Sequence, residues 1–176
     1  MLSLNIKCSL DTSNLQKIKA AVEREANKSV QVGWFDTTDH PDRLARAKNH
    51  STVAGVAFRN EFGIKRGDGG ADEFGVPERP FIRPTILWYT REWQINSLKR
   101  IARAALTDKD TTGRRKALGK HLVNELRKTI DNRKHTGKKD NSEFIAERKG
   151  FNHPLKGKTD ILRNSIRHRL VDNGVE

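Results

Sequence analysis

The sequence predicts an α+β fold, in which a small antiparallel or mixed sheet packs with about four helices and carries a long flexible loop and a proline strap. Two observations lead to this prediction. Short stretches at 30–35 and 166–171 have the β-branched, aromatic or alternating residues of strands. Longer stretches between them repeat apolar residues at three- and four-residue steps, as amphipathic helices do. The length of 176 residues suits one domain, 1–176, and no internal repeat is visible.

The first half of the chain is expected to form a strand, a helix, a second strand and a second helix. Residues 1–10 alternate apolar and polar side chains, as a half-buried strand does. Residues 13–16 have the spacing of a capping box, and the apolar positions of the helix that follows are Leu15, Ile18, Val22 and Ala26. After the strand at 30–35, Pro41 leads into a second helical stretch that includes Val53, Ala57 and Phe58. Gly63 lies just past its end, where a left-handed C-cap suits glycine.

The second half begins with a loop around 64–76, whose glycines and charges cannot bury enough apolar surface to order it, so we expect it to be mobile. Pro84 can begin a third helix with an apolar stripe made of Trp88, Ile95, Leu98, Ala102 and Ala105. Residues 107–113 break this helix. The fourth helix carries an i, i+4 row of Leu118, Leu122, Leu126 and Ile130. A short helix capped at 159–160 and a strand at 166–171 complete the chain.

Three prolines make residues 76–84 a stiff strap. Proline fixes φ and biases the residue before it towards extended geometry, so we expect neither a helix nor a central strand here. The simplest interpretation is an ordered connector whose Phe81 covers the core. The alternative is a support that presents Arg79 and Arg83 to a partner. For Glu61, pairing with one of these arginines at the helix end is favoured over a catalytic role.

The formal net charge of +13 raises nucleic acid as a partner, because a basic surface attracts phosphate whatever the sequence. The positive excess is concentrated between residues 99 and 139. This region has two interpretations, a solvated helix face or an electrostatic docking surface. The scarcity of aromatic residues argues against a single-strand binder. The predicted basic docking surface consists of Arg114, Arg115, Lys116, Lys120, Arg127 and Lys128.

The sequence contains no recognisable catalytic or metal-binding motif. Residues 155–159 contain the Gly-Lys-Thr of a phosphate-binding loop, but Asn152 occupies the position of its first glycine. The six histidines lack metal-ligand spacing, and no Gly-x-Ser-x-Gly motif supports a hydrolase. The single cysteine, Cys8, excludes an intramolecular disulfide and suits a reducing cytoplasm. We therefore expect no enzyme activity and no cofactor. No window has the apolar length of a membrane span or the pattern of a signal peptide.

Four segments, in this order along the chain, resemble a known protein family. They are Val32-Gly-Trp-Phe35; Val53-Ala-x-Val-Ala57-x-x-Asn60-Glu61-Phe62-Gly63; Pro77-x-Arg79-Pro80-Phe81-x-Arg83-Pro84; and a closing segment with Lys149-Gly-Phe-Asn-His-Pro-Leu155 and Thr159-Asp-x-Leu-x-Asn-Ser-Ile166. Together they resemble the tail-completion and head–tail joining (neck) proteins of tailed bacteriophages, the minor tail protein Z-like group. One departure is Asp160, where the family often has glycine. The basic stretch before the closing segment has no counterpart in the resemblance.

The resemblance implies a non-enzymatic virion structural protein that forms a ring at the head-proximal end of the tail and completes the head–tail joint. A hexamer follows from the sixfold symmetry of such tails. Implied partners are further copies of the chain, tail terminator or tail tube proteins and head connector or adaptor proteins; contact with phage DNA in the lumen is left open. The implied location is the tail or neck of the virion, after assembly in the host cytoplasm.

Interface residues expected from the strap and the segment before it are Asn60, Glu61, Phe62, Pro77, Arg79, Pro80, Phe81, Arg83 and Pro84. Two other functions are kept as alternatives. One is a basic nucleic-acid-binding protein that uses the 99–139 region. The other is a hydrolase with an unrecognised site.

Overall fold

A computed structural model describes residues 12–35, 52–63, 77–132 and 160–172, together with 147, 152, 153 and 155. Its elements are α1 (Ser13–Ala26), β1 (Lys28–Gly33), α2 (Val53–Phe62), α3 (Ile82–Pro84), η2 (Thr85–Tyr89), α4 (Arg91–Leu106), α5 (Thr112–Asn132), α7 (Ile161–Asn164) and β2 (Arg167–Asp172). Helices combined with an antiparallel sheet confirm the predicted α+β class. The predicted first strand, the helix start near Pro41 and the loop around 64–76 lie outside the described residues.

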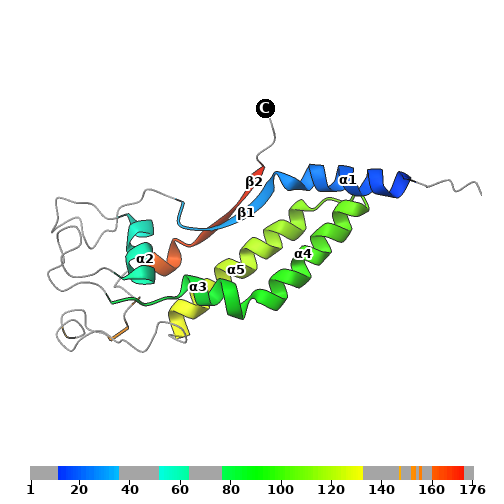
Figure 1. The fold of residues 1–176 in the computed structure, drawn as a ribbon. Coiled ribbons are helices and arrows are strands. Elements are labelled where there is room, and N and C mark those ends of the chain that lie inside the picture. Colours follow the sequence, from blue (N-terminus) through cyan, green and yellow to red (C-terminus); the bar gives the residue numbers. More distant parts are fainter. Residues whose placement is uncertain are drawn as a thin grey trace, which may run out of the picture.

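The two strands form an antiparallel ribbon that packs on α5 (Figure 1). Lys28 lies opposite Asp172, and Gly33 lies opposite Arg167. The side chains of β1 alternate in exposure, since every second residue is more exposed than its neighbours up to position 32. Both strands were therefore predicted correctly in type. β1 begins two residues earlier than expected, and β2 begins one residue later.

Helices α4 and α5 form an antiparallel hairpin, and Trp93 of α4 stacks on His121 of α5 with ring centroids 3.7 Å apart. The row predicted for the fourth helix is confirmed: Leu118, Leu126 and Ile130 are buried and Leu122 is half-buried. Of the stripe predicted for the third helix, only Ala105 is buried. Its exposed members are Trp88, Ile95, Leu98 and Ala102. The residues of α4 that are buried are Ile101, Ala104 and Ala105.

The third helix differs from the prediction because it is not continuous. Thr85–Tyr89 form a π-helical turn, in which the amide of Thr90 donates to the carbonyl of Thr85 at 3.2 Å. A π turn spaces its hydrogen bonds more widely than an α-helix, so residues before and after it do not share one apolar stripe. Pro84 is the last residue of α3 rather than the first of a long helix.

Helix α1 lies across the turn end of the hairpin, and its N-terminal half extends beyond it (Figure 1). Arg24 ties the two together, because its guanidinium donates to Asp108 Oδ1 at 2.6 Å and to the carbonyl of Ala105. Residues 12–20 are all exposed, and Ala21 is the buried residue of the helix. The predicted capping box is wrong: the N-cap is Thr12, whose side chain makes no capping hydrogen bond, and Ser13 is already helical.

The main core lies at the other end of the hairpin, around Phe81. The indole Nε1 of Trp34 donates to the carbonyl of Leu162 at 2.8 Å, and its ring meets Phe81 edge-on with centroids 6.0 Å apart. The buried members of this core are Val53, Ala57, Phe81, Val123, Leu126, Ile130, Leu155, Leu162 and Ile166. Described residues from all four segments that resemble the phage family therefore meet in this core.

The proline strap is only partly as predicted. Pro77–Phe81 has no regular secondary structure, but Ile82–Pro84 form a helical turn, so the expectation that this segment excludes helix is wrong for Arg83. Proline is tolerated there because the first turn of a helix does not use its amide N–H groups. Gly63 has the expected positive φ, 70°, but its ψ of 176° is not that of a left-handed helix. Asp160 is the N-cap of α7 and makes no side-chain capping bond.

Gly119 lets α5 approach β2 closely, and Gly119→Ala tests this contact. An added Cβ would lie 2.6–2.9 Å from three side-chain atoms of His168, including its Cβ, which moves only with the strand. We expect a loss of about 1–3 kcal/mol of stability in urea unfolding, despite the better helix propensity of alanine. The matched control is Gly113→Ala in the same helix, where no atom lies within 4 Å. Equal effects of the two substitutions would contradict the close approach.

Candidate functional site

Glu61, near the end of α2, holds the strap in place. Its side chain is 1% exposed. Oε2 accepts from the amides of Phe81 at 2.7 Å and Ile82 at 2.8 Å, and Oε1 accepts from the amide and Nε of Arg83 at 3.0 and 2.9 Å. Arg83 also donates to the carbonyl of Glu61 and to Glu78. One carboxylate thus satisfies the free amides that begin α3.

The pKa of Glu61 follows from these contacts. Burial raises the pKa of the carboxyl. Hydrogen bonds lower it by more, and they come from the backbone amides of Ile82, Phe81 and Arg83 and from the Arg83 side chain. The pKa of Glu61 therefore lies below its ordinary value. A carboxylate held ionised in this way is a poor general acid. The predicted pairing of Glu61 with Arg79 or Arg83 is confirmed for Arg83.

Several residues predicted as interface are interior in the folded chain. Phe81 is 0% exposed, and Glu61, Arg79 and Pro84 are also buried. Buried side chains cannot contact a partner without unfolding, so these four leave the predicted interface. The interpretation of the strap as a connector whose Phe81 covers the core is confirmed. The exposed or half-exposed remainder is Asn60, Phe62, Pro77, Pro80 and Arg83.

An aromatic patch made of Phe58, Phe62 and Arg83 lies on the surface beside this core. The two rings, one helical turn apart on α2, have centroids 4.7 Å apart and are 63% and 51% exposed. The guanidinium of Arg83 lies 4.9 Å from the centroid of Phe62, within cation–π range. Glu61 orients this guanidinium from below. Exposed aromatic residues with a positioned arginine are typical of interaction surfaces.

Arg79 is a buried cation beside the same helix. Its amide donates to the carbonyl of Asn60 at 2.7 Å, and its Nη1 lies 3.4 Å from Asn60 Oδ1. Burial lowers the pKa of its guanidinium. Within the described part of the chain, its Nε has no hydrogen-bond partner. Arg79 therefore helps to join the strap to α2 and is not available on the surface.

The predicted basic docking surface is divided by the fold. Arg114, Lys116, Lys120 and Lys128 are exposed on α5. Arg115 is 7% exposed, and its Nε lies 4.0 Å from Glu25, so it must be removed from this surface. Arg127 is half-buried and donates to the carbonyl of Ile166 at 3.1 Å. Burial, followed by repulsion from Arg167 and Arg163, lowers its pKa.

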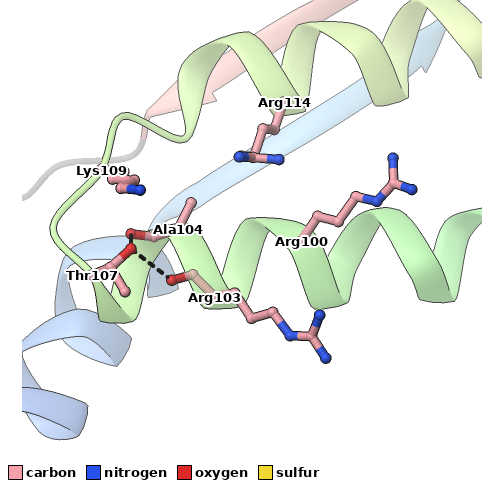
Figure 2. A pocket seen from close by; sticks show the side chains of 6 residues that line it. All are labelled: Arg100, Arg103, Ala104, Thr107, Lys109 and Arg114. Atoms are coloured by element: carbon pink, nitrogen blue, oxygen red, sulfur yellow. Dashed lines mark hydrogen bonds between the residues drawn. The ribbon is translucent and has the colours of Figure 1, made fainter.

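A basic hollow of about 330 Å³ lies where α4 and α5 meet the turn between them (Figure 2). Its lining residues are Arg100, Arg103, Ala104, Thr107, Lys109 and Arg114. Figure 2 shows Arg114 projecting from α5 into the space beside α4. The sequence places Arg100, Arg103 and Arg114 in the same basic stretch, but the predicted docking surface included only Arg114 of the three. Arg103 lies close to one helical turn before Thr107, and Arg100 lies close to two turns before it. This spacing was the available signal that the three residues share one face of the helix.

Large apolar side chains are exposed on α1, α2, η2 and α4. They are Leu15, Ile18, Val22, Phe58, Phe62, Leu87, Trp88, Trp93, Ile95, Leu98 and Leu106. Single exposed apolar residues are ordinary, but α1 presents three of them at helical spacing on a segment with little packing of its own. The apolar face predicted for this helix is therefore present, and no part of the chain that the structure describes covers it.

Two further observations bear on function. Among the described residues, no group of three or more His, Cys, Asp or Glu side chains is placed to hold a metal ion. None of the helices in the described ranges is both long and apolar enough to cross a membrane.

Comparison with known proteins adds no relative. The chain matches no protein-family model, no curated protein and no solved structure. The resemblance to phage tail-completion proteins therefore rests on the four short segments and their order along the chain.

Proposed function

We propose that this protein is a non-enzymatic virion structural protein that forms a ring at the head-proximal end of a phage tail and completes the head–tail joint. The four ordered segments support this role, and the fold supports it by packing them around Phe81. Its partners in this proposal are further copies of itself, arranged as a hexamer, with tail proteins on one side and head connector proteins on the other.

The observation that carries the proposal is the uncovered apolar face of α1. A helix of 14 residues is marginally stable alone and needs an apolar face packed against something. In this chain the N-terminal half of α1 projects past the hairpin (Figure 1), and along the helix Leu15, Ile18 and Val22 are 61%, 48% and 61% exposed. A projecting helix that contacts a different surface of the next copy makes a heterologous contact, and such contacts form a ring when the rotation between copies closes.

The aromatic patch of Phe58, Phe62 and Arg83 supports the same role from the opposite end of the molecule. It lies on α2, next to the strap, whereas α1 lies at the hairpin turn (Figure 1). Two uncovered surfaces far apart on one chain suit a subunit that contacts more than one neighbour. Glu61 and the prolines fix the strap beforehand, so less conformational entropy is lost when the patch binds.

The double variant Leu15→Gln with Val22→Gln tests the proposal. Glutamine is a good helix former, so helix content should persist, while association should weaken by about tenfold or more because burial of each apolar side chain contributes about 1.5–3 kcal/mol. Mass photometry over a concentration series measures association, and negative-stain images of the protein alone and with tails show whether rings form.

The matched control is Lys17→Gln, an exposed polar residue on the same helix. It should assemble like the unmodified chain. A chain that stays monomeric at all concentrations and does not bind tails contradicts the proposed function. Equal association of the double variant and the control contradicts the part assigned to α1.

A further inference from the structure

The basic hollow is lined by cations without acids. Arg100 and Arg103 come from α4, Lys109 from the turn and Arg114 from α5, and the two remaining lining residues are Ala104 and Thr107. Figure 2 shows the side chain of Lys109 on the turn and that of Arg114 on the first part of α5. Like charges gathered in one hollow repel each other. An anion that enters the hollow is attracted by the positive charges and reduces this repulsion.

The acidic residues near the hollow are already engaged elsewhere. Asp108 accepts from Arg24 at 2.6 Å, Asp110 accepts from the amide of Thr112 at 2.9 Å, and Glu25 binds Lys28 and Thr111. Hydrogen bonds from Thr112 lower the pKa of Asp110, which matches its role at the start of α5. By contrast, within the described ranges none of the four cationic side chains of the hollow has an ion pair or a side-chain hydrogen bond.

The chemistry of the lining favours phosphate over a protein carboxylate. Three of the cations are arginines, whose planar forks donate two hydrogen bonds to a phosphate group. Protein–protein interfaces have an apolar centre with few charges, whereas protein–DNA interfaces are more polar and strongly positive. This hollow has no large apolar side chain and no aromatic ring on which an unpaired base could stack.

We propose that the basic hollow binds the phosphate backbone of double-stranded DNA. The hollow is open to solvent, so adjacent phosphates of a duplex can reach it without any rearrangement of α4 or α5. Contacts to backbone phosphates carry no sequence information, so binding is independent of DNA sequence and falls as salt rises. This inference does not depend on the role in head–tail joining, because the chain alone suffices to test it.

The experiment measures fluorescence anisotropy of a labelled DNA duplex titrated with the full chain at several salt concentrations. The test variant combines Arg100→Gln, Arg103→Gln and Arg114→Gln, all at exposed positions. We expect its affinity for the duplex to fall by at least about tenfold. The slope of log affinity against log salt should become shallower by the equivalent of about two to three phosphate contacts. Circular dichroism should be unchanged.

The matched control removes the same charge outside the hollow through Lys17→Gln, Lys116→Gln and Lys120→Gln, also at exposed positions. It should keep most of the affinity and of the salt slope. Equal losses in the two variants would show a general charge effect and overturn the site. Absence of duplex binding by the unmodified chain at low salt would overturn the proposal too. Tighter binding of single-stranded DNA than of the duplex would also overturn it. Displacement of the duplex by polyglutamate at equal charge concentration would overturn it as well and would indicate an acidic protein as the partner.

Discussion

Replacing Glu61 by glutamine is expected to lower the free energy of unfolding by about 3 kcal/mol, because a buried carboxylate that accepts several hydrogen bonds is lost. The amides of Phe81, Ile82 and Arg83 all point at its two oxygens. Glutamine has one acceptor oxygen and an NH₂ group that cannot accept, so at least one buried amide loses its partner. Urea unfolding followed by circular dichroism measures the loss.

The loss caused by Glu61→Gln should depend on pH in a defined direction. The pKa of Glu61 is lower in the folded chain than its ordinary value, so the carboxylate stabilises the fold fully above the unfolded pKa of about 4.3. That contribution declines as the pH falls through the lower, folded pKa. The stability difference between the unmodified chain and the variant should therefore be constant above about pH 6 and narrow in acid.

Glu78→Gln is the matched control, because Glu78 binds the same Arg83 from an exposed position. Exposed ion pairs contribute about 0–1 kcal/mol, so the control should unfold nearly like the unmodified chain. Equal losses for the two substitutions, or a difference for Glu61→Gln that does not change with pH, would show that Glu61 does not act as a buried carboxylate.

Replacing Phe81 by alanine is expected to cost about 3–5 kcal/mol, enough to remove most of the stability of a small domain. Phe81 is 0% exposed and contacts Trp34, and the apolar ends of α2, α5 and α7 pack in the same core. Alanine would leave a cavity among elements that are distant in sequence. A lower thermal midpoint and weaker near-ultraviolet circular dichroism are the expected readouts.

Phe62→Ala is the control for this substitution, because Phe62 lies on the aromatic patch at 51% exposure. It should change the thermal midpoint little and, in the proposed function, weaken assembly. The two phenylalanines belong to successive segments of the resemblance but differ in role: Phe81 is in the core and Phe62 is on the surface. If Phe81→Ala left the thermal midpoint unchanged while assembly failed, the strap would belong to the interface after all.

The elements that the sequence predicts best are those with a strong local period. In α5, Leu118, Leu126 and Ile130 recur at helical spacing and are buried as expected. The β-branched and aromatic residues of the first described strand and the alternation of the last one likewise predict β1 and β2. Such periods follow from the geometry of one helix or strand, so the residues alone contain the information. The pairing of Glu61 with an arginine was also expected from the sequence, but Glu61 and Arg83 are 22 positions apart and the fold brings them together.

Tertiary structure decided which apolar face is covered. The residues Leu15, Ile18 and Val22 of α1 and Ile95 and Leu98 of α4 have helical spacing but lie on the surface. A period shows that a helix has an apolar face, but it does not show whether another part of the same chain packs against it. The π turn before α4 also separates Trp88 from the other residues of the predicted stripe, which no local pattern revealed.

The sequence by itself determined the α+β class, the helical row of α5, the two strands and a strongly basic chain. Only the tertiary structure decided that Arg115 is interior beside Glu25 while Arg114, its neighbour in sequence, faces the basic hollow with Arg100 and Arg103. Successive residues of a helix point about 100° apart, so equal charge and adjacent position lead to different surroundings. The surroundings of each side chain depend on which elements the folded chain brings against that helix.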